Sequence, residues 1–255
     1  MFKGALNPMK TLVVIPARYG STRFPGKALA DLHGKPLVVR VMEQASGMKS
    51  ADHITVATDD RRIFDAVTEA GFPCEMTGNH ATGTDRIGEV AARHDADIIL
   101  NLQGDEPLLD PIIADHLVEA MLNDANLDMA TCAHPFSSEE QWQDPNNVKV
   151  LIDQMKNALY FSRAGVPGIF PGKKPSYPVG HEVALRHVGL YAFRRTALEK
   201  FLKLAPTPLE KAEGLEQLRA LENGMSIKVL KIYQAPIGVD TPEDLEQVRK
   251  MWRSE

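Results

Sequence analysis

The chain has 255 residues, of which 44% are hydrophobic and 25% charged, and its formal net charge is −5. These values are typical of a soluble globular protein and exclude a fibrous or disordered chain. The sequence has no basic block and no apolar stretch near the ~20 residues that a bilayer requires, so we expect neither a nucleic acid nor a membrane as a partner. Cys74 and Cys132 are too few for a disulfide framework, which indicates reduced thiols in the cytoplasm.

The first half of the chain alternates short apolar runs with segments of helical periodicity. The apolar runs predict buried strands at residues 11–15, 54–57, 97–100 and 129–132. The periodic segments predict helices at residues 37–45, 59–70, 84–93 and 111–122. This rhythm indicates βαβ units, and therefore an α/β fold with a mostly parallel twisted sheet and helices on both faces.

The second half of the chain is less regular. It predicts strands at residues 148–152, 158–161, 188–193 and 227–232, and helices at residues 209–223 and 242–252. Residues 165–180 are rich in Gly and Pro, which favours a loop or a substrate-facing flap. We expect a disordered extension at residues 1–9 and one domain at residues 10–255, with an inserted subdomain at about residues 150–210.

The loop after the first strand combines cations, hydroxyls and glycines. Within residues 16–27 it contains Arg18, Ser21, Thr22, Arg23 and Lys27. Such groups bind polyphosphates, and ligands bind at the carboxyl ends of strands in open parallel sheets. The loop matches neither the Walker A nor the dinucleotide-binding glycine pattern. It is either a polyphosphate site or a solvated basic loop, and its position favours the first.

Carboxylates follow two other strands. Asp105 and Glu106 come directly after the strand at residues 97–100, where they would suit Mg²⁺ on a nucleoside triphosphate. Asp240 precedes the last helix and, taken alone, favours an N-capping role. Residues 57–60 and 76–86 would either read a base edge or cap helices. No His-Glu-x-x-His zinc motif and no Gly-x-Ser-x-Gly elbow is present, which argues against a zinc protease and a serine hydrolase.

Three segments in this order resemble a known enzyme family. They are the loop at residues 16–27, Gln103-Gly-Asp-Glu-Pro107 and Val239-Asp-Thr-Pro-Glu-Asp-Leu245. Together with segments 158–163, 186–191 and 215–219, they make the chain similar to the CMP-Kdo synthetases, which are 3-deoxy-manno-octulosonate cytidylyltransferases. The resemblance covers about residues 11–249.

The resemblance implies a nucleotide-diphospho-sugar transferase fold with a smaller sugar-binding and dimerisation subdomain. It implies a cytoplasmic homodimer that converts CTP and 3-deoxy-manno-octulosonate (Kdo) to CMP-Kdo and pyrophosphate for lipopolysaccharide synthesis, with Mg²⁺ as cofactor. The alternative is the same chemistry on 8-amino-Kdo or another 2-keto sugar acid such as a sialic acid. Residues 168–177 depart from the family pattern, which leaves the precise sugar acid open.

The resemblance also implies roles for individual residues. The catalytic set is Arg18, Lys27, Asp105 and Asp240, and the two aspartates are the metal ligands. The CTP-binding set is Arg18, Ser21, Thr22, Arg23, Lys27, Thr58, Asp59, Thr77, Gly83 and Thr84. The sugar-acid set is Gln103, Arg163, His187, Tyr191, Glu216 and Gln217. For the sugar carboxylate we favour Arg163 over His187, although Arg163 in a structural role remains the alternative.

Overall fold

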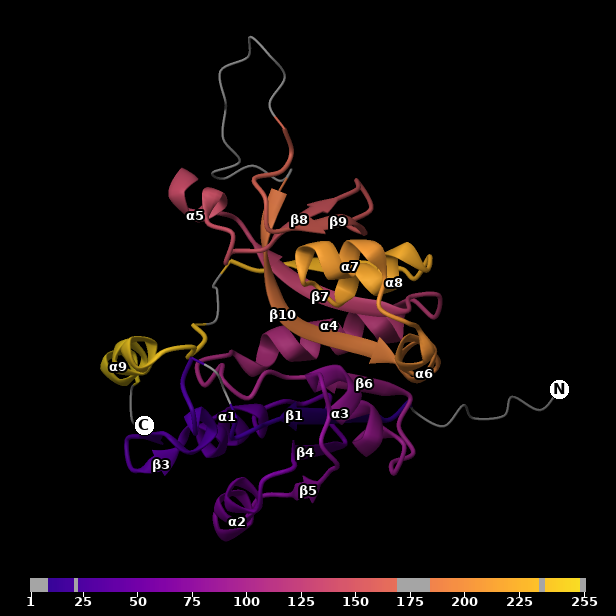
Figure 1. The fold of residues 1–255 in the computed structure, drawn as a ribbon. Helices are drawn as coiled ribbons and strands as arrows, with labels where there is room; N and C mark the ends of the chain where they lie inside the picture. The colour runs from indigo at the N-terminus through magenta and orange to yellow at the C-terminus, as the bar shows by residue number, and fades with distance from the viewer. Residues whose placement is uncertain (1–8, 21–22, 169–183, 234–236, 253–255) are drawn as a thin grey trace, which may run out of the picture.

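The computed structural model describes residues 9–20, 23–168, 184–233 and 237–252. A nine-stranded mixed sheet forms its centre, and seven strands run across it in the order β11-β7-β10-β6-β1-β4-β5 (Figure 1). Their bounds are β1 Thr11–Pro16, β4 His53–Thr58, β5 Cys74–Met76, β6 Ile98–Asn101, β7 Met129–His134, β10 Ala184–Arg194 and β11 Ile227–Lys231. The strands β8 Lys149–Ile152 and β9 Ala158–Ser162 join the sheet through β10.

The half of the sheet around β1 is parallel. β1 lies between β4 and β6 and pairs with both in parallel, and β4 continues in parallel to β5. β10 instead runs antiparallel to β6, β7 and β8. The carboxyl ends of β1, β4 and β6 therefore meet at one edge of the sheet, where ligands bind in open α/β folds.

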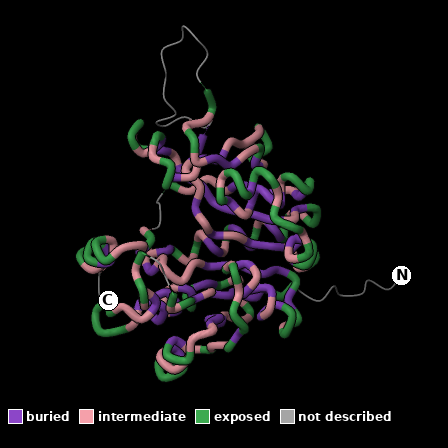
Figure 2. Tube along the Cα trace, in the orientation of Figure 1, coloured by how far each residue is buried: buried purple, intermediate pink, exposed green. Residues whose placement is uncertain are grey.

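Helices cover both faces of the sheet and bury two apolar clusters. One cluster lies under α1 Leu37–Ala45, α2 Arg61–Glu69 and α4 Pro111–Asn123. The other lies under α3 Gly83–Ala91, α6 Arg195–Lys203 and α8 Gln217–Glu222. Buried residues concentrate in the strands and exposed residues on the outer helix surfaces, as Figure 2 shows. This arrangement confirms the predicted α/β class with helices on both faces.

The remaining elements are short or peripheral. A third apolar cluster joins α9 Pro242–Met251 to the hairpin of β2 Asp31–Leu32 and β3 Lys35–Pro36. The helix α5 Glu139–Gln143 precedes β8, the helix α7 Pro208–Glu213 precedes α8, and the 3₁₀ helix η1 Lys27–Leu29 follows the first loop. No helix in the described ranges is both long and apolar enough to cross a membrane.

The structure corrects several predicted elements. One helix was predicted at residues 209–223, but the structure has α7 and α8, separated at Gly214, which has a left-handed backbone with φ of 62°. β5, α5 and α6 were not predicted. The range 150–210, expected to be an inserted subdomain, supplies β8, β9 and β10 to the same sheet as β1. The subdomain assignment stays a prediction, and residues 1–8 and most of the 165–180 segment lie outside the described residues.

Candidate active site

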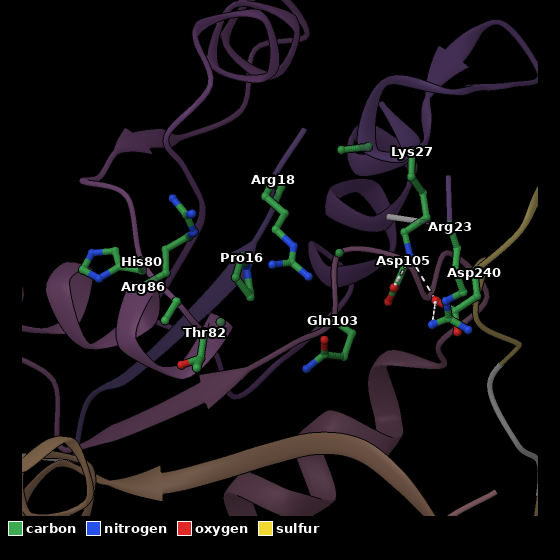
Figure 3. A pocket seen from close by; sticks show the side chains of 15 residues that line it. Pro16, Arg18, Arg23, Lys27, His80, Thr82, Arg86, Gln103, Asp105 and Asp240 are labelled. Atoms are coloured by element: carbon green, nitrogen blue, oxygen red, sulfur yellow. Dashed lines mark hydrogen bonds and ion pairs between the residues drawn. The ribbon is translucent and has the colours of Figure 1, made fainter. Parts of the chain in front are cut away.

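A cavity of about 340 Å³ lies where the parallel strands end. Figure 3 shows cationic and anionic side chains facing it from segments that are far apart in the sequence. Its polar side chains are those of Arg18, Arg23, Lys27, His80, Thr82, Arg86, Gln103, Asp105 and Asp240. Five of these nine residues belong to the predicted nucleotide and metal sets, and Gln103 belongs to the predicted sugar-acid set, so the structure brings part of the predicted nucleotide and metal site into one place.

Lys27, which lines this cavity, forms ion pairs with both predicted metal ligands. Its Nζ donates to Asp105 Oδ2 at 2.5 Å and to Asp240 Oδ1 at 3.2 Å, and Arg23 also contacts Asp240 Oδ1 at 3.0 Å. Gly26 has φ of 73°, which directs the chain into η1, and a Cβ there would meet the Tyr19 ring at 3.2 Å. Glycine adopts this backbone without the strain that a side chain would add, so Gly26 helps to fix the place from which Lys27 reaches the carboxylates.

The two aspartates are held by their local backbone. The Val239 amide donates to the Asp105 carbonyl at 2.8 Å, which joins the turn after β6 to the turn before α9. Thr241 and Asp244 form a capping box at the start of α9, and Asp244 also accepts from the Asp240 amide at 2.9 Å. Thr241 and Asp244 thus cap the helix while the Asp240 side chain faces the cavity, so the N-capping interpretation of Asp240 is wrong.

The donor set fits a hard divalent cation. Two carboxylate oxygens lie within 3.2 Å of the same ammonium group, so they already converge on one positive charge. Carboxylate oxygens are the ligands that Mg²⁺ prefers in proteins. In the structure the Lys27 ammonium group balances part of the negative charge of these two carboxylates. A metal ion bound there would have to share the carboxylates with Lys27 or displace its ammonium group.

Glu106 adds an unexpected feature beside this pair. Its Oε2 atom is buried and has no hydrogen-bond partner among the described residues. Burial, reinforced by the negative charges of Asp105 and Asp240, raises the pKa of Glu106 to about 8. The side chain is therefore mostly neutral at pH 7, which limits the negative charge at this end of the cavity.

Arg86 was not among the predicted site residues, although the sequence segment that contains it was. Its guanidinium is buried and contacts Asp59 Oδ2 at 3.0 Å and Thr77 Oγ1 at 2.5 Å. Asp59 and Thr77 thus position a cation at the cavity wall, while the hydroxyl of Thr58 accepts from the Asp60 amide at 3.1 Å. A basic residue just inside the start of α3 is the only signal for Arg86 in the sequence, because its partner Asp59 follows a different strand.

A second cavity of about 350 Å³ adjoins the first, since Gly83 and Gln103 line both. Its polar side chains are those of Thr84, Asn101, Gln103, His187, Tyr191, Glu216 and Gln217. Thr84 donates to Glu216 Oε2 at 2.8 Å, and the Gln103 amide donates to the Gly189 carbonyl at 2.9 Å. Five of the six predicted sugar-acid residues therefore surround one cavity, and Thr84 faces this cavity.

Three polar atoms in this second cavity are buried without a hydrogen-bond partner among the described residues. They are Tyr191 Oη, Glu216 Oε1 and Asn101 Oδ1. Burial raises the pKa of Tyr191 well above its ordinary value and lowers that of His187 to about 3. Tyr191 is therefore a neutral donor and His187 a neutral imidazole. Since a buried polar group without a partner costs about 1–3 kcal/mol, these atoms favour polar contents, either water or a polar ligand.

Four predicted residues within the described part of the chain do not line these cavities: Thr58, Asp59, Thr77 and Arg163. The guanidinium of Arg163 donates to the carbonyls of Glu213, Pro145 and Gly214 at 2.7, 3.2 and 3.5 Å, and Arg163 is not among the residues that line the second cavity. In the structure Arg163 thus joins segments of backbone, and its ligand role stays a prediction. Ser21 and Thr22 lie outside the described residues.

Comparison with known proteins first defines the class. Residues 12–227 match the family described as "Cytidylyltransferase", which places the chain among the cytidylyltransferases, a class of nucleotidyltransferases. At 15% identity and a TM-score of 0.62, the structure also resembles a 4-diphosphocytidyl-2C-methyl-D-erythritol synthase from Anaerococcus prevotii, a likeness of fold alone.

Closer relatives define the family. A 3-deoxy-manno-octulosonate cytidylyltransferase of Geobacter metallireducens is 48% identical over 94% of this chain and 96% of its own, and that of Pelobacter propionicus is 47% identical over 96% and 98%. A CMP:2-keto-3-deoxy-manno-octonic acid synthetase solved with CTP has a TM-score of 0.88 and 41% identity, covering 95% of this chain and 98% of its own. The chain belongs to the 3-deoxy-manno-octulosonate cytidylyltransferase (CMP-Kdo synthetase) family.

Proposed function

We propose that this chain transfers CMP from CTP to Kdo and releases pyrophosphate. The anomeric hydroxyl oxygen of Kdo forms a bond to the α-phosphorus, and the bond between the α-phosphorus and the oxygen that joins it to the β-phosphate breaks. Pyrophosphate leaves with that oxygen, and the proton of the Kdo hydroxyl is released to solvent. The observation that carries the proposal is the pair of adjoining cavities, which share Gly83 and Gln103. One is cationic, and the other has buried polar atoms that lack a hydrogen-bond partner among the described residues. A reaction that joins a triphosphate to a polyhydroxylated acid needs two such compartments in contact.

The first cavity has the charges that a triphosphate needs. Arg18, Arg23 and Lys27 provide cations from one loop, and buried Arg86 provides another from α3. The amino end of α3, at Gly83, faces the same space and adds the partial positive charge of a helix N-terminus. Catalysis of nucleotidyl transfer is mainly positioning and charge neutralisation, so these groups bind CTP and offset the charge of the leaving pyrophosphate.

Asp105 and Asp240 hold the divalent cation, which we propose is Mg²⁺. A bound Mg²⁺ neutralises phosphate charge and lowers the pKa of a coordinated hydroxyl. The protein's own contribution is to keep both carboxylates in place, through Lys27 in the free enzyme and through the backbone contacts of the two turns. Neutral Glu106 provides no third negative charge that would repel the phosphates.

The second cavity binds the sugar acid. Neutral Tyr191 donates a hydrogen bond to a sugar oxygen, and Glu216 Oε1 accepts one from a sugar hydroxyl. Gln103, His187 and Gln217 complete the polar wall. His187 is neutral, so the charge that balances the sugar carboxylate comes from outside this cavity's own side chains: from the amino end of α3, from Arg86, or from Arg163 if it leaves its backbone contacts. We further propose that the enzyme works in the cytoplasm as a homodimer.

The test is pyrophosphate release by the purified chain with Kdo, Mg²⁺ and each of CTP, UTP, ATP and GTP. We expect release with CTP and at least about 100-fold lower kcat/KM with the other nucleotides. Removal of Mg²⁺ with EDTA should abolish release, and adding Mg²⁺ back should restore it. Equal release with UTP or ATP would contradict the nucleotide assignment, and undiminished release in EDTA would contradict the metal assignment.

A further inference from the structure

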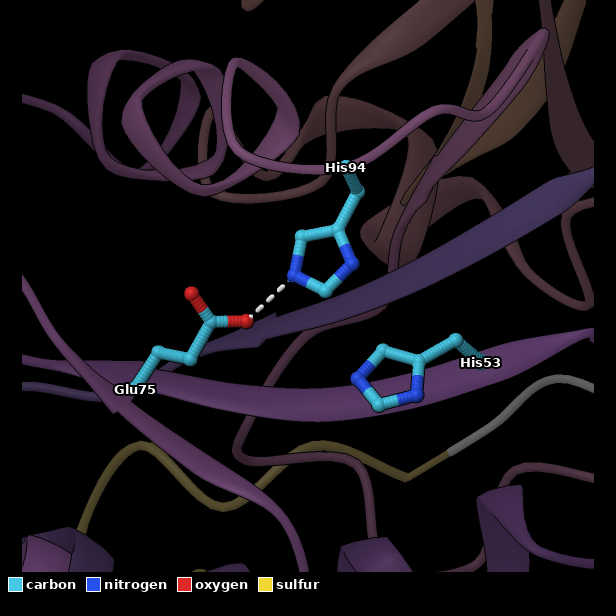
Figure 4. A group of neighbouring side chains, drawn as sticks. All are labelled: His53, Glu75 and His94. Carbon is cyan, nitrogen blue, oxygen red and sulfur yellow. Dashed lines mark hydrogen bonds and ion pairs between the residues drawn. The ribbon is translucent and has the colours of Figure 1, made fainter.

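Three side chains that bind transition metals converge outside the two cavities. They are His53, Glu75 and His94, and one ligand atom from each lies within 4.8 Å of the other two. His53 begins β4, Glu75 is the middle residue of β5, and His94 lies in the turn after α3. Figure 4 shows the two imidazoles and the carboxylate facing a common space. Because three separate segments supply them, the grouping is produced by the tertiary fold rather than by neighbours in the sequence.

The three side chains contact one another directly. Glu75 Oε1 lies 2.6 Å from His94 Nε2, and the rings of His53 and His94 stack with centroids 4.9 Å apart. The other carboxylate oxygen of Glu75 accepts from Arg93 Nη1 at 3.2 Å. Arg93 thus holds the carboxylate so that Oε1 faces the imidazoles. Metal-ligating carboxylates are commonly oriented by such a hydrogen bond.

We propose that His53, Glu75 and His94 bind one divalent transition-metal ion of the Zn²⁺ class. Two imidazole nitrogens and one carboxylate oxygen are a common ligand set for zinc, with a water in the fourth position. Imidazole suits Zn²⁺, Co²⁺ and Ni²⁺, whereas Mg²⁺ prefers oxygen ligands. The site therefore differs in its ligand chemistry from the one formed by Asp105 and Asp240, and the two sites share no residue.

The rearrangement that binding requires is small. Ligand atoms about 2.0–2.1 Å from a tetrahedral metal are about 3.3–3.4 Å apart, so the longest separation has to shorten by at most about 1.5 Å. The stacked rings, now inclined by 24°, must also turn until both lone pairs point to one centre. Side-chain rotations accomplish both, while the backbone stays fixed by the pairing of β4 with β1 and by the Arg195 guanidinium on the His94 carbonyl.

The bound ion would tie the carboxyl end of α3 to β4 and β5. Gly83, at the amino end of the same helix, lines both cavities of the active site. A metal that binds only the folded chain stabilises it by mass action. We therefore expect the ion to raise the melting temperature in the presence of saturating Mg²⁺, whether or not turnover changes.

The test is a titration of the EDTA-treated, desalted full-length chain with Co²⁺, followed by its visible absorption, in millimolar Mg²⁺ so that the Asp105–Asp240 site is occupied. We expect one equivalent to bind with the strong absorption of tetrahedral Co²⁺, and Zn²⁺ to displace it. The variants His53→Gln and His94→Gln should each bind at least tenfold more weakly. The variant His116→Gln, at an exposed histidine of α4, is the matched control and should bind as the parent does.

Two outcomes would overturn the proposal. One is no saturable Co²⁺ binding in excess Mg²⁺, and the other is binding that both His53→Gln and His94→Gln leave unchanged. Melting curves in EDTA establish that the variants fold. If either variant does not fold, the test is the Zn²⁺-dependent shift of the imidazole NMR resonances in the parent chain. Shifts of the His53 and His94 resonances support the site, and shifts of other histidine resonances alone refute it.

Discussion

Neutral Glu106 makes a sharp prediction about how stability depends on pH. In the unfolded chain its carboxyl has the ordinary pKa of 4.5, and in the fold burial raises the pKa to about 8. Folding is therefore unaffected by this group below pH 4.5. As pH rises from 4.5 towards 8, the unfolded chain releases a proton that the folded chain keeps, so stability falls by about 1.4 kcal/mol per pH unit.

The variant Glu106→Gln removes this ionisation while keeping the shape of the side chain. From the two pKa values we expect it to be more stable than the parent by about 3 kcal/mol at pH 7, and by less than about 1 kcal/mol at pH 5. At pH 7 the gain corresponds to a rise in melting temperature of at least roughly 6 °C. The exposed Glu119 of α4 provides the matched control, because Glu119→Gln should change stability by under about 0.5 kcal/mol at either pH.

The assay is urea unfolding followed by circular dichroism between pH 5 and 8, in EDTA, because a bound cation would lower the pKa of Glu106. The signature is a stability difference between Glu106→Gln and the parent that grows with pH. A difference that stays constant across this range would refute the reasoning, and so would a parental Glu106 carboxyl whose ¹³C resonance titrates near 4.5.

Three further substitutions test other parts of the site and fold. Asp240→Asn should reduce kcat at least about 100-fold with an unchanged circular dichroism spectrum, and near-parental turnover in excess Mg²⁺ would contradict its metal role. Tyr191→Phe should raise KM for the sugar acid up to about tenfold, as for one lost hydrogen bond, whereas Tyr160→Phe, outside the cavities, should not. Arg219→Met leaves buried Glu210 unpaired and should lower the free energy of unfolding by about 3–5 kcal/mol, measured in urea; a loss under 1 kcal/mol would contradict the ion pair's importance.

Sequence patterns predicted the main strands because the apolar runs of β1, β4, β6 and β7 are buried on both faces. The pattern failed where local signals were weak. β5 is only three residues long and has a charged residue at its centre, so it has no apolar run to detect. α6 begins directly at the end of β10 without a turn residue between them. The break between α7 and α8 depends on the left-handed conformation of Gly214, which helical periodicity does not reveal.

The site divides in the same way. Lys27, Asp105 and Asp240 each belong to a recognisable local motif in the sequence. The topology of the parallel strands brings the three motifs together in space. The role of Arg86 depends on Asp59, which follows a different strand, so only the folded structure pairs them. The raised pKa of Glu106 depends on the burial of one oxygen atom, and the free hydroxyl of Tyr191 on the absence of a partner among the described residues. Neither is visible in the order of residues.

Product analysis with a panel of sugar acids tests the central claim most directly. The purified chain is given CTP, Mg²⁺ and either Kdo, 8-amino-Kdo or a sialic acid, and the CMP-linked sugar is quantified by mass spectrometry alongside pyrophosphate. The account predicts CMP-Kdo in one-to-one amount with pyrophosphate, and a kcat/KM for Kdo that exceeds those for the other two acids. A higher kcat/KM for 8-amino-Kdo or a sialic acid, or CTP binding without any CMP-linked product, would contradict it.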